Sequence, residues 1–262
     1  MGILEEAIST GALVGDGDRV LAALSGSQRL VAYDNKGQPL WQRSIGQNTS
    51  GAGLNLAPKR GILTKANLPS SGGTRLTYFD RSCGLERWKL QLDGTWLIGQ
   101  SVAVGTASRI AMLLTKRNTF LRIQALSAEG NKLWRHDFEP VFGLASFEDA
   151  GTLRIFGPVG ADDALHVLRC QHTKTGFRNL LEAFDMKTGA RLNRAELPFL
   201  GCVAKQAVLL NNGLLVTMRQ DINENAHVVA IQTKSPGLAK TVWPTFCADN
   251  ARSCNASIAL SR

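Results

Sequence analysis

The sequence predicts an all-β fold built from about five repeated units of four short strands. Three observations carry this prediction: a polar turn with glycine that recurs along the chain, a tryptophan soon after most of these turns, and a second periodic turn ahead of each. The chain has 262 residues, of which 44% are hydrophobic and 19% charged, so it can bury a sizeable core. Its 26 glycines are about a tenth of the chain, above the usual share of about 7%, and they indicate many turns.

The glycine repeat defines a recurring hairpin. Four segments read as an apolar strand, a polar turn and a second strand: residues 29–41, 75–88, 121–134 and 180–193. Their turn glycines are Gly37, Gly84, Gly130 and Gly189, and Trp41, Trp88, Trp134 and Asn193 stand at the matching position of the second strand. A weaker fifth copy, residues 228–243, has Gly237 and Trp243. Glycine permits the positive φ of such turns, and a large ring at a fixed place indicates packing between units.

A second turn and apolar strand precede each hairpin, at residues 15–24, 57–66, 105–114, 148–157 and 210–219. Each unit therefore contains four strands, and tandem four-stranded units of roughly 40–50 residues are typical of a β-propeller. We predict blades at residues 8–48, 49–94, 95–140, 141–198 and 199–246, followed by a tail, residues 247–262, which could help to close the ring. The alternatives of a five-bladed ring and of a larger ring completed by further blades stay open.

The hairpin pattern resembles a known repeat. The best copy runs from Tyr33 and Asp34 to Gly37 and Trp41, and the next best is the segment 184–189 (FDMKTG). Residues 243–252 (WPTFCADNAR) look like a segment that often flanks such repeats, although Cys254 and Asn255 depart from the small residues that usually follow. These motifs resemble the pyrroloquinoline-quinone-like (PQQ-like) repeat family of bacterial β-propellers.

The resemblance implies a propeller fold and one of two kinds of function. The family includes quinone-dependent dehydrogenases, which carry a vicinal cysteine pair and acidic calcium ligands, and non-enzymatic scaffolds that bind proteins. This chain has no adjacent cysteines and no evident calcium constellation. The resemblance therefore implies a non-enzymatic member, for which we expect no catalytic residues, no cofactor and no bound metal.

We accordingly expect a non-catalytic binding or scaffold module whose partner is a protein or a second copy of the chain. The first alternative is a carbohydrate-binding propeller, and the second is an enzyme with its site at the mouth of the central channel. The formal charge is +9, but the 30 basic residues are scattered, so nucleic-acid binding is not expected. No apolar run is long enough to span a membrane.

Candidate binding residues lie in the fourth unit, which is longer than its neighbours. The extra residues fall within 160–179 and predict an extended hairpin, either a binding loop or a plain decoration. It contains four candidates: His166, Arg169, His172 and Arg178. In a strand, Cys170 would share one side with His166 and His172, but no fourth ligand is indicated, so a metal site is not expected.

Three aromatic residues form a second candidate group. Trp96, Phe142 and Phe199 fall at similar places after the repeat positions, where the chain crosses from one blade to the next near the central channel. They could stack on a sugar or clamp a peptide at the channel mouth. The alternative is plain packing between blades.

The cysteines bear on localisation. The chain has five, so at least one is unpaired within the chain, and Cys247 and Cys254 could close a small disulfide or stay as two thiols. The acidic start, residues 1–6, does not look like a signal peptide. From the resemblance and the candidate disulfide we expect a bacterial periplasmic or secreted location, with a cytoplasmic one left open.

Overall fold

The architecture is known from a computed structural model of the chain. It describes residues 12–16, 18–24, 28–45, 50–68, 72–96, 102–116, 120–138, 153–173, 176–198, 202–220 and 225–240. All regular secondary structure within these residues consists of β-strands, which form five antiparallel sheets. The predicted all-β fold class is confirmed.

The first and second sheets each have four strands in chain order. The first contains β1 (Ala12–Asp16), β2 (Arg19–Leu24), β3 (Arg29–Tyr33) and β4 (Pro39–Ser44). The second contains β5 (Ser50–Ala57), β6 (Gly61–Leu68), β7 (Gly73–Asp80) and β8 (Glu86–Asp93). Adjacent strands are joined by short turns, because apolar alternation and turn residues recur in each unit.

The third sheet differs at its inner edge. It contains β9 (Thr95–Trp96), β10 (Ala103–Val104), β11 (Ile110–Lys116), β12 (Phe120–Leu126) and β13 (Lys132–Phe138). Both β9 and β10 pair with β11, at different points along its length. These two short strands together take the place of one innermost strand, so the four-stranded plan is kept.

The fourth sheet contains the longest strands of the described chain. Its members are β14 (Leu153–Val159), β15 (Ala164–Thr173), β16 (Gly176–Asp185) and β17 (Arg191–Leu197). The β15–β16 pairing runs out to Thr173 opposite Gly176, which confirms the extended hairpin predicted in this unit. The fifth sheet, as far as the structure describes it, consists of β18 (Cys202–Leu209), β19 (Leu214–Gln220) and β20 (Ala226–Gln232).

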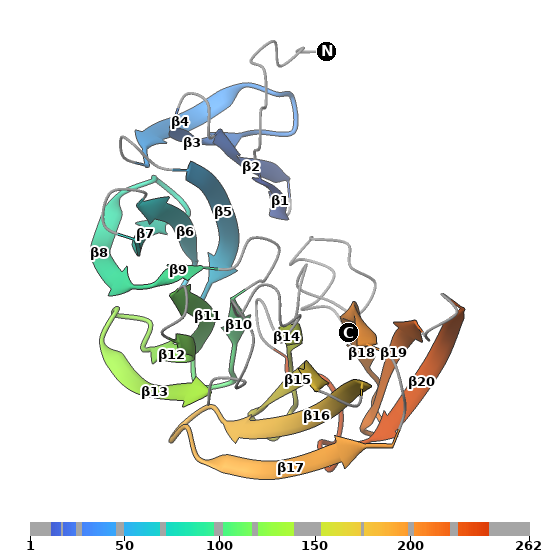
Figure 1. Cartoon of the computed structure of the whole chain (residues 1–262). Coiled ribbons are helices and arrows are strands. Elements are labelled where there is room, and N and C mark those ends of the chain that lie inside the picture. Colours follow the sequence, from blue (N-terminus) through green and yellow to red (C-terminus); the bar gives the residue numbers. More distant parts are fainter. Residues whose placement is uncertain are drawn as a thin grey trace.

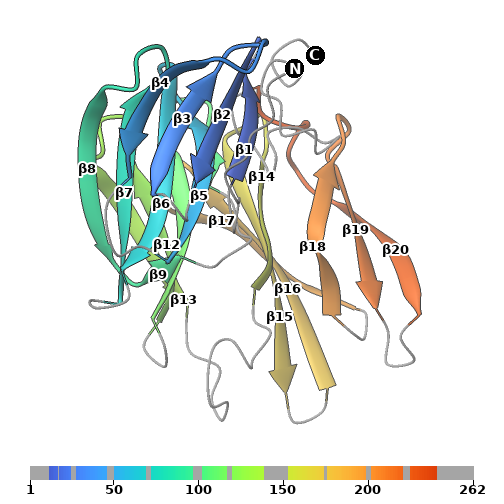
Figure 2. The same cartoon turned by 90° about the horizontal axis from the view of Figure 1, so that it is seen from above.

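The five sheets stand around a common centre as the blades of a propeller (Figure 1). The first strand of each unit lies innermost, and β1 neighbours β5, β10 neighbours β14, and β14 neighbours β18. The first sheet and the fifth sheet are the two ends of this arc (Figures 1 and 2). Each of these two end sheets therefore has one face that looks away from the rest of the arc.

Tryptophan connects successive sheets by a repeated contact. Each of the three repeat tryptophans that the structure describes lies against the repeat glycine of the next sheet, so that an added Cβ on the glycine would come within 2.6–2.8 Å of the ring. Trp243 of the fifth copy lies outside the described residues. The pairs are Trp41 with Gly84, Trp88 with Gly130, and Trp134 with Gly189. This contact confirms the predicted role of the tryptophans, and it explains why glycine recurs at that place.

Two of these rings are also hydrogen-bonded to the sheet that they contact. The indole Nε1 of Trp88 donates to the backbone oxygen of Ala128 at 2.9 Å, and that of Trp134 donates to the backbone oxygen of Met186 at 3.0 Å. The indole N–H of Trp41 is buried without a hydrogen-bond partner in the described chain. The hydrogen bonds fix the tilt of the rings, because an indole has a single donor.

Buried apolar side chains fill the spaces between sheets. One cluster joins the first three sheets, a second joins the third to the fourth, and a third joins the fourth to the fifth. The core is therefore divided among the gaps between blades, as expected for strands that alternate between two covered faces. No helix among the described residues is long and apolar enough to cross a membrane.

Candidate functional site

The fifth sheet has one covered face and one open face. Its covered face packs Ala207, Leu209 and Leu215 against Leu168 and Leu181 of the fourth sheet. Residues paired directly across antiparallel strands point to the same side, so the register assigns the members of the other face. Five apolar members of this other face are named here the fifth-sheet face: Val208, Val216, Met218, Val228 and Ala230.

The fifth-sheet face is exposed where the matching face of another sheet is buried. Val228 is 75% exposed, more than any other large apolar side chain of the described chain, and Met218 on the neighbouring strand is 51% exposed. In the first sheet, Leu21 and Leu30 look toward the next sheet and are 0% exposed. The difference follows from position, because no described sheet follows the fifth.

The other end of the arc also has an apolar face. In the first sheet, Ala22, Leu24 and Val31 form a small buried cluster with Tyr33 packed against it. This cluster is separate from the cluster that joins the first sheet to the second. Gly37 lies at this end, and nothing in the described chain stands within 4 Å of an added Cβ there. The first sheet therefore lacks, among the described residues, the tryptophan contact that the next three sheets receive.

His166 lies inside the fold. Its side chain is 3% exposed, and its Nε2 is 2.9 Å from the hydroxyl of Ser235. Burial lowers the pKa of His166 to about 4, although Asp162 opposes this shift. The backbone bridge from Gly160 to Leu238 lies beside this contact, so His166 helps to anchor the chain after β20 to the fourth sheet.

Arg169 is part of a buried ion-pair group. Its Nε lies 2.8 Å from a carboxylate oxygen of Glu182, and its guanidinium lies 4.6 Å from the centre of the Phe138 ring. The second oxygen of Glu182 is 3.4 Å from Arg191. Glu182 is completely buried, so this group connects three strands of the fourth sheet and touches the third.

Arg178 makes the matching contact at the surface. It lies 2.8 Å from Glu196 across β16 and β17, and both side chains are exposed. The two arginines that the sequence singled out are thus engaged in ion pairs within one sheet. A role in ligand binding stays a prediction for them and for His166.

The other candidates are described in part or not at all. Trp96 is in β9, opposite Leu114, and His172 is in β15, opposite Phe177, but their side chains lie outside what the structure describes. Phe142, Phe199, Cys247 and Cys254 lie outside the described residues. No group of three potential metal-binding side chains occurs among the residues that the structure describes.

No family model and no curated protein matches this chain. Solved structures do match, and they include the Dos1 propeller, with a TM-score of 0.54 and 9% identity over 89% of this chain and 57% of that one. A eukaryotic initiation factor matches with a TM-score of 0.53 and 14% identity, over 88% of this chain and 55% of that one. BBS1N, in a complex with ARL6DN, matches with a TM-score of 0.53 and 11% identity, over 88% of this chain and 67% of that one.

These similarities concern the fold. All three identities are far below 25%, so the neighbours show a β-propeller and carry no function across. The chain spans little more than half the length of the initiation factor and of the Dos1 propeller.

Sequence reasoning missed the fifth-sheet face, although a signal was present. The outermost described strand, β20, contains the unbroken apolar run Val228, Val229, Ala230 and Ile231. Runs without alternation are typical of strands that are covered on both faces. By contrast, β8, the last strand of the second sheet, reads ERWKLQLD and alternates with charged residues.

Proposed function

We propose that this chain is a non-catalytic propeller module that binds a partner protein through the fifth-sheet face. The observation that carries the proposal is the exposure of Val228 and Met218 in strands whose sequence is apolar on both sides. Exposed apolar patches on folded proteins commonly mark interaction sites. Burying one such side chain completely contributes about 1.5–3 kcal/mol, so a few of them can anchor an interface.

The partner that suits this surface is a protein that presents an apolar β-sheet face. The face is the surface of a sheet, and the gaps between the described sheets of the propeller are filled by one sheet packing against the next. A neighbour of the same fold, BBS1N, was solved in a complex with another protein, which supports the general use of such a fold in protein binding.

The proposal extends to the repeat class and to localisation. We assign the repeats to the PQQ-like class, which the segment 33–41 and the segment 184–189 support. An extracytoplasmic location is part of this assignment, and a disulfide between Cys247 and Cys254 would accord with it. The mass of a proteolytic peptide that contains both cysteines, measured with and without reductant, tests this pairing.

A photo-crosslinking amino acid at position 228 tests the binding surface directly. The full chain would be expressed in its own organism and irradiated, and the crosslinked peptide would be identified by mass spectrometry. We expect one adduct with a strand of another protein, and we expect the added substitution Met218→Asp to remove it. The matched control carries the crosslinker at Lys89, which is exposed on β8.

Two results would contradict the proposal. An equal yield of adducts at positions 228 and 89 would mean that the fifth-sheet face has no preferred partner. If the only adduct were with a second copy of this chain, the fifth-sheet face would be a surface for self-association and not for a partner protein.

A further inference from the structure

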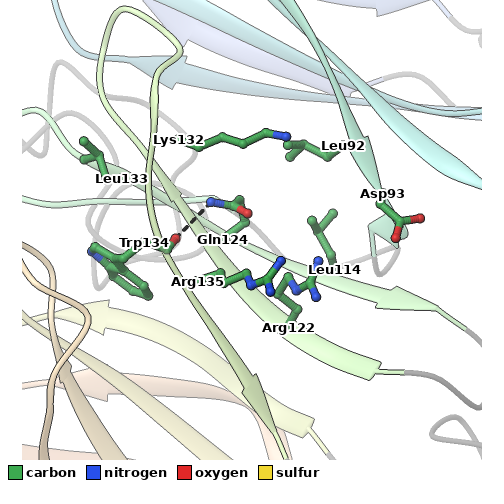
Figure 3. Close-up of a pocket in the computed structure, with 9 residues that line it drawn as sticks. All are labelled: Leu92, Asp93, Leu114, Arg122, Gln124, Lys132, Leu133, Trp134 and Arg135. Atoms are coloured by element: carbon green, nitrogen blue, oxygen red, sulfur yellow. Dashed lines mark hydrogen bonds between the residues drawn. The ribbon is translucent and has the colours of Figure 1, made fainter.

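A pocket of about 380 Å³ opens between the second and third sheets, away from the fifth-sheet face. Leu92 and Asp93 of β8 form one side, and residues of β12 and β13 form the other (Figure 3). Its volume lies within the usual range for small-ligand sites, about 300–1,000 Å³. The chemistry of its walls indicates what it can hold.

Arg122 forms the rigid part of the wall. It binds Asp137 of the neighbouring strand with two hydrogen bonds, one of them 2.8 Å from Nη2 to Oδ2. The Arg122 side chain is only 13% exposed, and its guanidinium lowers the pKa of Asp137. Because the two charges balance each other, this pair positions the wall without adding net charge.

Two other cationic side chains at the pocket are not held by an ion pair of the kind that Arg122 forms with Asp137. Lys132 and Arg135 of β13 both line the pocket and are exposed, and neither forms an ion pair with a residue that the structure describes. They lie on the same strand, on the side of the pocket that faces β8 (Figure 3). They supply positive charge that a ligand can use.

Gln124 adds an oriented acceptor. It is 6% exposed, and its Nε2 donates to the backbone oxygens of Ala125 and Trp134 at 3.0 and 2.9 Å. Two carbonyl acceptors fix which end of the amide carries the nitrogen. Its Oε1 points away from these bonds (Figure 3) and receives no hydrogen bond from the described chain. An oriented, unused acceptor in a pocket calls for a ligand that brings a donor.

We propose that this pocket binds an acidic peptide segment. Side-chain carboxylates pair with Lys132 and Arg135, and a peptide N–H donates to Oε1 of Gln124. The combination of cations with an oriented acceptor matches a peptide, because a peptide offers carboxylates and amide donors a few ångströms apart. The site is independent of the fifth-sheet face, so either proposal can fail alone.

Two acidic side chains limit the net positive charge of the pocket. Asp93 lines the opposite wall, and Asp137 is next to Arg122. Against the three cations Arg122, Lys132 and Arg135, these two carboxylates leave one positive charge in excess, and they repel a peptide carboxylate and a phosphate alike. A nucleic acid brings one phosphate charge per nucleotide and could pair with the same cations. Nucleic acid is therefore the competing ligand that the experiment must exclude.

Fluorescence anisotropy of the full chain with a labelled, C-terminally amidated tetraglutamate peptide tests the proposal. We expect binding at low ionic strength that is about tenfold weaker for the tetraglutamine peptide. The double substitution Lys132→Gln and Arg135→Gln should weaken binding of the tetraglutamate peptide about tenfold. Backbone N-methylation of the peptide should also weaken it, because this change removes the donor to Gln124.

The control keeps the net charge of the test variant. Lys36→Gln with Arg194→Gln removes one exposed lysine and one exposed arginine outside the pocket. This variant should bind the tetraglutamate peptide within about twofold of the unchanged chain. An equal loss of affinity for the tetraglutamate peptide in both double variants would overturn the proposal, because the overall positive charge of the chain would then explain the binding. Tighter binding of a ten-nucleotide single-stranded RNA at the same residues, or no peptide binding at millimolar concentration, would also overturn it.

Discussion

Gly37 and Gly189 illustrate at the residue scale how the repeat holds the blades together. Their φ angles are +78° and +74°, so both adopt a conformation that favours glycine. An added Cβ at Gly189 would lie 2.6 Å from the ring of Trp134, whereas nothing in the described chain is within 4 Å of one at Gly37. Gly37 therefore serves only its turn, whereas Gly189 serves both its turn and the contact between the third and fourth sheets.

This pair of glycines gives a matched prediction. Gly189→Ala should lower the free energy of unfolding by about 2–5 kcal/mol, from backbone strain of about 1–2 and a clash with Trp134 of about 1–3. Gly37→Ala should cost only the strain. Urea unfolding of both variants measures the difference. Equal losses would mean that the tryptophan contact does not restrict this position.

His166 provides a prediction on pH. The pKa of the buried imidazole is about 4, whereas the unfolded chain binds this proton near pH 6.5. The unfolded state therefore holds more protons between these values, and the His166 contribution to stability is lost as the pH falls from about 6.5 to 4. The expected loss is about 3 kcal/mol.

The variant His166→Gln isolates this contribution, because glutamine can still bond the hydroxyl of Ser235 but does not titrate. We expect the unfolding free energy of the variant to change less between pH 7 and pH 4.5 than that of the unchanged chain. The same slope in both proteins would assign the acid sensitivity to other groups.

At the scale of elements, the fourth sheet contains two similar ion pairs in different surroundings. Arg169 and Glu182 are buried, and Arg178 and Glu196 are exposed, while each arginine lies 2.8 Å from its partner. Removing one partner of a buried pair leaves an uncompensated charge, which is far more costly than losing a contact in water.

We therefore expect Glu182→Gln to destabilise the protein by about 3–5 kcal/mol, and Glu196→Gln to cost less than about 1 kcal/mol. Thermal unfolding of both variants at neutral pH distinguishes them. A small effect of Glu182→Gln would mean that water reaches Arg169 and compensates its charge.

The sequence predicts the elements better than their contacts. The turn glycines, the tryptophans and the extra length of the fourth unit led to the hairpins and to β15 and β16, because period and turn chemistry are local properties. The split of the inner strand into β9 and β10 has no such signal. The contact of His166 with Ser235 also escaped prediction, because the two residues are 69 positions apart. Periodicity assigns a residue to a face but does not identify its partner on another strand.

At the scale of the whole molecule, the arc has two ends, and both are apolar. The first sheet has Ala22, Leu24 and Val31 on its outward side, and the fifth sheet presents Met218 and Val228. The sequence predicted strands with alternating faces but left open whether the five blades close into a ring, and therefore whether the first and fifth sheets would cover each other. The exposure of the fifth-sheet face is the central claim, because protein binding is proposed from it.

Oxidative footprinting of the purified chain with dilute peroxide tests this claim most directly. Met218 is 51% exposed, whereas Met112 and Met186 are buried in the clusters between sheets and serve as internal controls. The rate of sulfoxide formation at each methionine, measured by mass spectrometry, reports its access to solvent. We expect Met218 to oxidise well before Met112 and Met186. Equal, slow oxidation of all three would contradict the account, because the fifth-sheet face would then be covered in the free chain.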